Sequence, residues 1–267
     1  MAVSIGARIN TPINAYNAYN ALNNINRQLG TAQLRLATGL RVNTVSDDPS
    51  GYTIAKQMES RSGVLSAAVN NIGDAKNMVG TAEAALQTVR DLLTTIKEKV
   101  AQANNPVSDK TALANDVNQL ATEINDIIGK TDFNGTALFS TASGSFTASF
   151  QVGANVTDTV SATWSASFAS IANQTAGSIG NLDVSSNVST IETALQTMGS
   201  LISRMDAKES NLNVTITNLD ASKSRIMDAD IAKEQLEATK LQILQQTAVT
   251  QLAAANSSNQ VFLTLFR

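Results

Sequence analysis

Three carboxylates lie close together in the stretch DADIAKE, and a cluster of this kind is a candidate metal site. Its members are Asp228, Asp230 and Glu234. A calcium loop of the EF-hand type needs an oxygen ligand at its fifth position and glycine at its sixth. The sequence places Ala232 and Lys233 there. We therefore expect charges on a helix surface at this stretch, with no bound metal and no cofactor.

The chain contains no histidine and no cysteine, which excludes most catalytic arrangements. Ser-His-Asp triads, Cys-His pairs and zinc sites built from His or Cys each need one of these residues. Thiol redox chemistry and disulfides are excluded for the same reason. An enzyme would have to work with carboxylates, lysine or tyrosine alone, and the sequence has no convergent pair of acids. We predict that the protein is not an enzyme and has no catalytic residue.

Aromatic side chains are a second candidate for ligand binding, but they are few and scattered. Aromatics make up 4% of the chain, and Trp164, Tyr16, Tyr19 and Tyr52 fall in different predicted elements. We expect these side chains to serve packing and interfaces. Because Ala, Asn, Ser and Thr are abundant instead, we expect helices that pack through small residues.

Charge and hydropathy exclude two further kinds of partner. The net charge is -3, without the basic surface that nucleic-acid binding needs. No run of about 18 apolar residues is present, so we expect no membrane insertion. The first residues, MAVSIGARIN, lack a basic region followed by a continuous apolar run, so we do not expect a secretory signal peptide.

Long helices are predicted wherever apolar residues alternate at spacings of three and four. This spacing is unbroken over Leu65–Ala103, after which the stretch NNP ends the helix. It resumes over Leu113–Ile127 in a second, antiparallel helix that we expect Gly129 to end. A third stretch covers Val188–Leu219, in which Glu209 is the one polar residue at the positions of the three-four spacing. We expect Glu209 at a solvated edge or as a device that fixes register.

Between the second and third of these stretches, the spacing of apolar residues changes from three and four to two. Phe146, Ala148 and Phe150 alternate with Ser, Thr and Gln, and the alternation resumes after Gly153–Asn155. Alternation by two on both sides of a turn predicts a β-hairpin, over about residues 145–168.

The two ends of the chain have helical spacing but no charge. No charged side chain occurs over Ile9–Asn26 or over Leu241–Phe266. Each end is the natural partner helix of the other, yet an uncharged pair must still be buried in something larger. We predict that both ends are largely disordered in the monomer and fold when neighbouring copies supply the missing contacts.

An ordered set of motifs in this sequence resembles bacterial flagellin. The first is LGTAQLRLATGLRVNTVSDDPSGYTIA, Leu29–Ala55. LQTVRDLL, TDFNGTALF, FQVGAN, SRIMDADIAKE and QILQQTAVTQLAAAN follow in order over nearly the whole chain. Pro49 departs from the family, which more often has alanine there, and Phe266 stands where leucine is common. The resemblance implies a mainly α fold, a long coiled-coil helical bundle with a small β-hairpin region, in which discontinuous domains pair the N- and C-terminal helices.

The resemblance also implies a function. The chain would be a secreted structural subunit that polymerises into the extracellular flagellar filament, the propeller for swimming motility. Residues 1–43 and 222–267 would pair as the inner core of the filament, and residues 44–221 would form its outer core. Expected partners are other copies of the chain, a flagellar export chaperone, the cap protein and the hook–filament junction proteins. A hook–filament junction protein or a related secreted coiled-coil adaptor is the alternative.

Two groups of candidate residues follow from these expectations. Gln87, Arg90, Asp91 and Leu92 match the segment that the vertebrate innate flagellin receptor contacts, but Thr88 stands where recognised flagellins have arginine. A solvated helix face within the subunit interface is the plainer interpretation of that segment. The expected assembly interface comprises Leu22, Ile25, Leu29, Leu36, Leu241, Leu244, Leu252, Val261, Phe262, Leu265, Phe266 and Arg267.

The stretch over Ser140–Ser178 is rich in Ser and Thr and has two interpretations. It is either an ordinary polar hairpin face or an O-glycosylated outer surface, which occurs in some flagellins. The candidate acceptors are Thr141, Ser143, Thr157, Thr159, Ser161 and Thr163.

Overall fold

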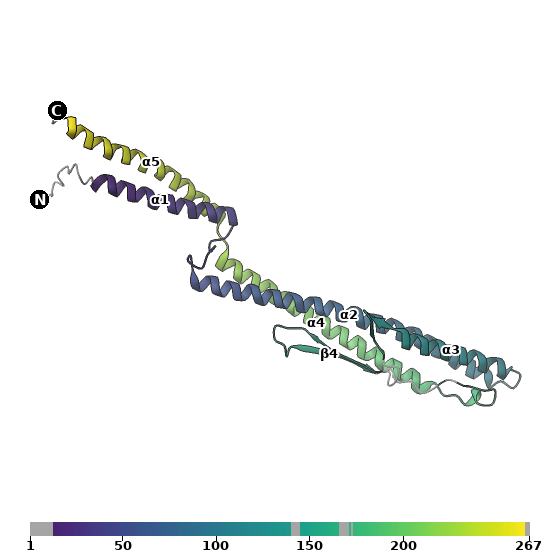
Figure 1. Cartoon of the computed structure of the whole chain (residues 1–267). Helices are drawn as coiled ribbons and strands as arrows, with labels where there is room; N and C mark the ends of the chain where they lie inside the picture. Colours follow the sequence, from purple (N-terminus) through teal and green to yellow (C-terminus); the bar gives the residue numbers. More distant parts are fainter. Residues whose placement is uncertain (1–12, 140–144, 166–170, 172, 265–267) are drawn as a thin grey trace. The chain divides into compact units, whose positions relative to one another are not determined.

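The computed structural model describes residues 13–139, 145–165, 171 and 173–264, and for residues 258–264 it describes the backbone only. The mainly α fold predicted from the sequence is confirmed (Figure 1). The helices are α1 (Ile13–Thr38), α2 (Pro49–Ala103), α3 (Lys110–Lys130), α4 (Ser185–Met227), α5 (Ile231–Thr264) and the short 3-10 helix η1 (Ile179–Asn181). The strands are β1 (Asp132–Phe133), β2 (Thr136–Ala137), β3 (Ser145–Gln151) and β4 (Thr159–Ser165).

The chain divides into two compact units. The terminal unit comprises residues 1–59 and 219–267, and the bundle unit comprises residues 60–218. Helices α2 and α4 each contribute to both units. The division expected from the sequence was placed at residues 43 and 221. The assignment of these parts to the inner and outer filament stays a prediction.

The core of the bundle unit follows the spacing of three and four along α2. Leu65, Ile72, Leu86 and Ile96 belong to this buried seam. Helix α3 folds back along the C-terminal half of α2, and the ion pair between Lys99 and Asp116 joins the two. Helix α4 contributes a third apolar face to the same core. Its buried apolar residues in this unit are Ile191, Ala194, Met198, Leu201, Met205 and Leu212.

Hydrogen bonds at the helix ends explain where the helices begin and stop. Asp48 precedes α2 and accepts the backbone N–H of Gly51 at 2.9 Å, as an N-cap does. Gly39, with φ +73, closes α1 in the left-handed conformation that glycine tolerates. The prediction that Gly129 ends α3 is wrong, because the helix continues through Lys130. There the backbone N–H and the hydroxyl of Thr131 both bond to the carbonyl of Ile127, so no left-handed residue is needed.

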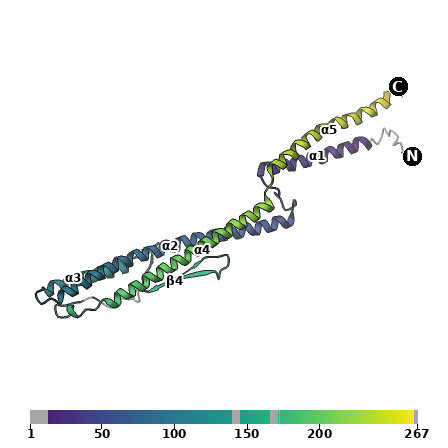
Figure 2. The same ribbon diagram turned by 180° about the vertical axis from the view of Figure 1, so that it is seen from behind.

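The predicted β-hairpin is present and lies alongside α4 in both views (Figure 2). Strands β3 and β4 are antiparallel, with Phe146 opposite Trp164 and their rings stacked at 4.5 Å between centroids. The side chains of Val160, Ala162 and Trp164 are buried. The indole N–H of Trp164 donates to the carbonyl of Leu138 at 3.2 Å, which anchors the hairpin to the segment that follows α3.

The other face of the hairpin carries almost only hydroxyl groups. Its cross-strand pairs are Ser145 with Ser165, Thr147 with Thr163, Ser149 with Ser161 and Gln151 with Thr159. We call these eight residues the hydroxyl face. Seven of the eight are Ser or Thr and none is charged, so the polarity of this face comes from neutral groups alone.

In the terminal unit, α1 packs against α5 through a thin apolar seam. Leu29 and Ala32 of α1 and Ala238 and Leu241 of α5 form its buried cluster, with Ile25 and Leu36 packed against it. No other residue of α1 is buried. None of the helices in the part of the chain that the structure describes is long and apolar enough to cross a membrane.

Candidate assembly surfaces

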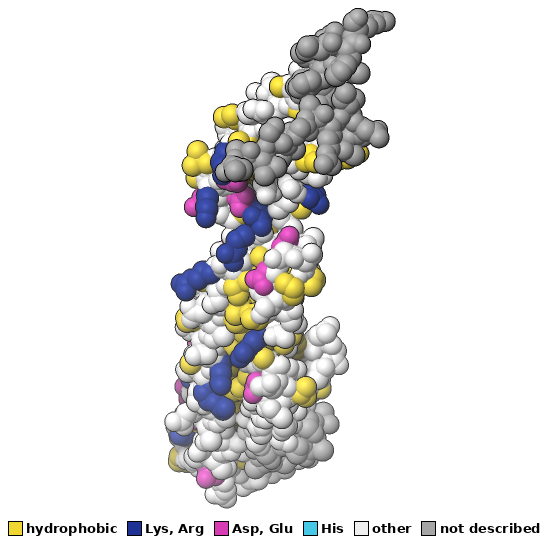
Figure 3. Space-filling view, turned by 90° about the vertical axis from the view of Figure 1, so that its left-hand side faces the viewer, with side chains coloured by type: hydrophobic (Ala, Val, Ile, Leu, Met, Phe, Trp, Pro, Cys, Tyr) yellow, Lys and Arg dark blue, Asp and Glu magenta, His cyan; other side chains and the backbone are white. Residues whose placement is uncertain are grey.

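The outer side of the α1–α5 pair is apolar or uncharged over most of its described length. Tyr16 and Tyr19 on α1 are 64% and 53% exposed, and Leu236 and Ile243 on α5 are 74% and 61% exposed. Among the described residues in the upper part of Figure 3, white atoms and yellow patches lie beside a few charged side chains. A neutral hydrogen bond also joins the two helices in this region, since the amide of Gln245 donates to that of Asn26 at 2.8 Å. Exposed apolar side chains of this size in one region indicate an interaction surface.

The structure divides the predicted interface residues into two sets. Leu29 and Leu241 are buried inside the pair, Ile25 and Leu36 pack against them, and Leu22 and Leu252 are half-buried. Leu244 does not lie in that seam and is 39% exposed. The side chains of Val261 and Phe262, and all of Leu265, Phe266 and Arg267, lie outside the described residues.

A junction that the sequence did not predict ties the α1–α2 loop to the α4–α5 turn within the terminal unit. Leu40 forms a β-bridge with Asp228, and the backbone N–H of Ala229 donates to the carbonyl of Gly39 at 2.9 Å. The guanidinium of Arg41 donates to the carbonyl of Ile226 at 2.8 Å. These bonds join segments that are far apart in the sequence, so no local pattern could have revealed them.

Charged side chains reinforce the same junction. Arg35 of α1 pairs with Glu234 of α5 at 3.2 Å, and the Glu234 side chain is only 14% exposed. In the loop, Asp47 accepts the backbone N–H groups of Asn43 at 3.0 Å and of Thr44 at 2.8 Å. These bonds from the Thr44 and Asn43 backbone lower the pKa of the Asp47 carboxyl.

The three carboxylates of the DADIAKE stretch have separate tasks. Asp228 accepts the hydroxyl of Ser224 at 2.5 Å. Asp230 caps α5 by accepting the N–H groups of Ala232 at 3.0 Å and of Lys233 at 3.2 Å. Glu234 belongs to the pair with Arg35. Nowhere in the described ranges do three acidic side chains gather closely enough to hold a metal ion.

Two family profiles match this sequence in separate segments. The one described as the bacterial flagellin N-terminal helical region matches residues 9–143, and the one described as the C-terminal helical region matches residues 183–266. Together they cover both terminal helices and most of the bundle.

The chain belongs to the bacterial flagellin family.

Two relatives agree with this assignment by sequence, and one solved structure is also similar over part of the chain. Flagellin FlaB1 of Treponema pallidum is 31% identical over 284 residues, which cover 97% of this chain and 99% of that protein. The flagellin of Bordetella bronchiseptica is 47% identical over 70 residues, 26% of this chain, and the match spans only 18% of that protein. The crystal structure of Bacillus cereus flagellin matches 59% of this chain and 88% of that one, at 22% identity and a TM-score of 0.32.

The family is a structural one, and this short flagellin is a subunit of the bacterial flagellar filament. Residues 1–43, 44–221 and 222–267 all overlap the matched segments. The alternative of a junction or adaptor protein has no better support.

The residues expected at the receptor segment of this flagellin lie on the solvent side of α2. Gln87 is exposed and its amide donates to Glu83 at 3.1 Å, one turn earlier. Arg90 and Asp91 are exposed and pair with each other at 3.0 Å. Leu92 is half-buried, and the hydroxyl of Thr88 bonds back to the α2 backbone.

Four of the six Ser and Thr residues named as candidate glycan acceptors lie on the hairpin. Thr159, Ser161 and Thr163 belong to the hydroxyl face and are exposed, and Thr157 is exposed in the hairpin turn. Thr141 and Ser143 lie outside the described residues.

Proposed function

We propose that this flagellin polymerises by burying its terminal helix pair among the terminal pairs of neighbouring copies. In this assignment residues 1–43 and 222–267 form the inner core of the filament, and residues 44–221, with the hairpin, form the outer core. One contact between two different surfaces, repeated without closing, gives an open helical filament.

The thin seam of the α1–α5 pair carries this proposal. Ile243 and Val249 remain 61% and 51% exposed on α5, and Tyr16 and Tyr19 remain exposed on α1. Fully burying side chains of this kind contributes about 1.5–3 kcal/mol each. Burying four of them in a filament would therefore supply several kcal/mol, enough to offset part of the ordering cost of two terminal helices.

The same exposed surface would also be recognised by other flagellar proteins. An export chaperone would cover the C-terminal segment before assembly, because the segment exposes apolar side chains until other copies bury it. The cap protein and the hook–filament junction proteins would contact the two ends of the polymer. The subunit would leave the cell through the flagellar export apparatus and become extracellular.

Seeded assembly, followed by electron microscopy, tests the role of the tail. We compare the full-length chain with a copy that ends at Lys240, in precipitating salt with short filament seeds. Only the full-length chain should form long tubes. Assembly of both would contradict the role given to the tail, and assembly of neither would favour a junction or adaptor protein.

Point variants test the exposed apolar side chains of α5 without removing the whole C-terminal segment. The double variant Ile243→Ser, Val249→Ser changes two exposed positions of α5, so the fold of the monomer should persist. Val107→Ser is the matched control, because Val107 is 92% exposed in the loop after α2. The α5 variant should elongate seeds poorly and the control should elongate them normally. Equal elongation would contradict the proposal.

For the receptor segment, we propose weak recognition because of Thr88. An arginine there would extend the exposed polar face formed by Gln87, Arg90 and Asp91. Thr88→Arg should raise activation of the vertebrate receptor in a reporter assay. No gain would leave this face with its interface role alone.

We propose O-glycosylation at Thr159, Ser161 or Thr163 of the hydroxyl face, at Thr157 in the hairpin turn, and at Thr141 or Ser143 in the preceding stretch. The intact mass of protein isolated from filaments should then exceed 28.0 kDa. An unmodified mass would reject glycosylation and make this stretch an ordinary polar hairpin face.

A further inference from the structure

Helix α4 of the bundle unit carries opposite charges on opposite sides. Successive residues of an α-helix are turned by about 100°, so residues four apart share a face and residues two apart face nearly opposite ways. Arg204 and Lys208 therefore share one side of α4. Asp206, two residues from each, lies on the other side, with Glu209 next to it across the helix surface.

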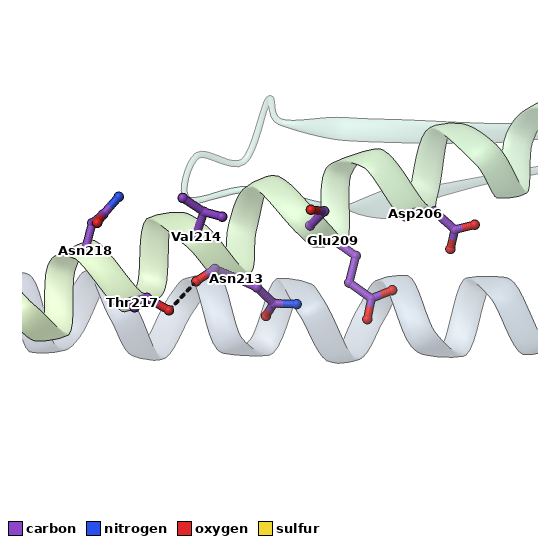
Figure 4. A pocket seen from close by; sticks show the side chains of 7 residues that line it. Asp206, Glu209, Asn213, Val214, Thr217 and Asn218 are labelled. Carbon is purple, nitrogen blue, oxygen red and sulfur yellow. Dashed lines mark hydrogen bonds between the residues drawn. The ribbon is translucent and has the colours of Figure 1, made fainter.

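The acidic side forms an open groove of about 500 Å³. Asp206 and Glu209 lie at one end of it, and Val214, 59% exposed, lies near its middle (Figure 4). Lys76 of α2 pairs with both acids, at 2.6 Å with Asp206 and 3.1 Å with Glu209. One cation held by two carboxylates leaves one net negative charge. The remaining lining residues are Ser210, Asn213, Thr217 and Asn218.

The basic side faces the hairpin and encloses a hollow of about 470 Å³. Arg61 of α2 and Lys208 of α4 line this hollow together with the hairpin turn. Asp158 lines it too and accepts the backbone and side-chain N–H groups of Asn155, at 3.0 and 2.9 Å. With two cations and this one carboxylate, the lining keeps one net positive charge. We call the hollow lined by Arg61 and Lys208 the basic hollow. We call the groove lined by Asp206 and Glu209 the acidic groove.

The cations of the basic side have no anionic partner in the described part of the chain. None of the ion pairs found there involves Arg61, Arg204 or Lys208. Val214 is exposed in the groove, and Val156, 84% exposed, lies in the hairpin turn between Asn155 and Thr157, which line the hollow. Both surfaces therefore combine an unbalanced charge of opposite sign with an uncovered apolar side chain.

We propose that the basic hollow of one copy binds the acidic groove of a neighbouring copy. Complementary potentials of this kind fix register and suppress wrong partners. The two surfaces differ, so each copy can bind one neighbour through its basic hollow and another through its acidic groove. The contact therefore repeats from copy to copy without closing. This inference rests on the proposed filament function and adds a contact between bundle units to the one between terminal helices.

A charge swap in the full-length chain tests the contact. Asp206→Lys and Lys208→Glu should each raise the critical concentration for seeded elongation by about fivefold, the upper range for one partly exposed charge pair. The double variant Asp206→Lys, Lys208→Glu should return to within about twofold of the native protein, because the interface then carries the same pair reversed. The control Asp206→Lys, Lys110→Glu has the same net charge, but its second change lies on α3, so it should not recover.

Carbodiimide coupling of native filaments provides a measurement without any substitution. The reagent joins the ammonium of a lysine to a nearby carboxylate as an amide, with loss of one water molecule. In filaments of mixed ¹⁴N and ¹⁵N copies, peptides that join Lys208 to Asp206 or Glu209 should carry both isotopes. Their absence from filaments, together with no recovery in the charge swap, would overturn the contact.

These outcomes distinguish this contact from the filament function itself. If the native chain does not polymerise, both proposals fail. If it polymerises but the two substitutions show no coupling, only the contact between bundle units fails. Loss of elongation in both single variants without recovery would mean that these charges act within one copy, which also overturns the contact.

Discussion

The bundle unit and the terminal pair use the same apolar spacing and reach very different degrees of burial. Along α2, Ile72 and Leu86 are 0% exposed, and their seam continues for the length of the bundle. Along α1, Leu29 and Ala32 are the buried residues, and Leu29 is still 8% exposed. The spacing alone therefore does not decide burial. The number of elements packed on a seam decides it.

The difference follows from what each seam meets. In the bundle unit α2 packs with α3, α4 and the hairpin, so its apolar side chains are enclosed. In the terminal unit α1 meets α5 alone, and two helices cannot enclose each other. Under the proposed assembly, the terminal pair is therefore the region whose environment added copies would change most.

The largest expected effect is on hydrogen exchange. Backbone amides of α5 beyond Leu241 should exchange rapidly in the monomer and slow by at least about a thousandfold in the filament, because local opening there costs little until neighbours pack on it. Amides around Ile72 and Leu86 should be protected in both states. Exchange of monomer and filament, read by mass spectrometry, compares them. Strong protection of residues 241–264 in the monomer would remove the contrast.

Truncation of a buried leucine should give the next largest effect. Leu86→Ala should lower the free energy of unfolding of the monomer by about 3 kcal/mol, since it leaves a cavity in an enclosed seam. Leu236→Ala on α5, where the side chain is 74% exposed, should change it by less than about 0.5 kcal/mol. Urea unfolding followed by circular dichroism gives both values. Similar losses at the two positions would show that the terminal pair is as well packed as the bundle.

Loss of a helix cap should have a smaller effect, and a different one in each region. Asp109 caps α3 by accepting the N–H groups of Thr111 and Ala112, so Asp109→Ala should destabilise the bundle unit by about 1 kcal/mol. Asp230→Ala removes the equivalent cap from α5. It should raise exchange in α5 while leaving the melting of the bundle unchanged. A shift of the bundle transition by the Asp230 variant would show that the two units unfold together.

The smallest expected effect is on the stability of the protein at acidic pH. Backbone hydrogen bonds from Thr44 and Asn43 lower the pKa of Asp47, and a bond from the Ser185 backbone, followed by its hydroxyl, lowers that of Asp183. Each folded pKa lies below the ordinary value of 3.8. These bonds therefore stabilise the protein above pH 3.8, and their contribution is lost as the pH falls through the folded pKa.

The two aspartates lie in different units, so asparagine variants distinguish them. Asp47→Asn should remove part of the acid sensitivity of exchange in the α1–α2 loop. Asp183→Asn should do the same at the start of α4. Exchange rates between pH 5 and about pH 2.5 provide the comparison. A variant whose pH profile matches that of the native chain would show that its aspartate does not contribute.

Most of the fold could be predicted because its signals are local. The long seam of α2, the caps at Asp48 and Gly39, and the alternation of the hairpin each depend on residues within a few positions of one another. Helix α3 marks the limit of such signals. Ala114, Val117, Ala121, Ile124 and Ile128 are its buried residues. The spacing predicted from the sequence starts at Leu113 and shares only Val117 and Ile124 with this buried face. Both faces of α3 are apolar at intervals of three and four, so the sequence pattern could not show which one is buried.

The surfaces could be predicted less well, because long-range contacts determine them. Arg41 bonds to the carbonyl of Ile226, 185 positions later, and nothing near either residue indicates it. The exposure of Leu244 depends on the direction from which α1 approaches α5. The charged sides of α4 become visible only when α2 and the hairpin are placed around it, because Lys76 neutralises part of one side and Arg61 adds to the other.

The hydroxyl face of the hairpin has a consequence for how the protein responds to dissolved salt. Neutral hydroxyls hold their hydration water by hydrogen bonds and carry no cloud of counterions, so dissolved salt has little to screen there. The charged sides of α4 respond in the opposite way, since their attraction weakens as the ionic strength rises. A rise in ionic strength would thus weaken the proposed contacts made through α4, while the hydration of the hairpin surface stays constant.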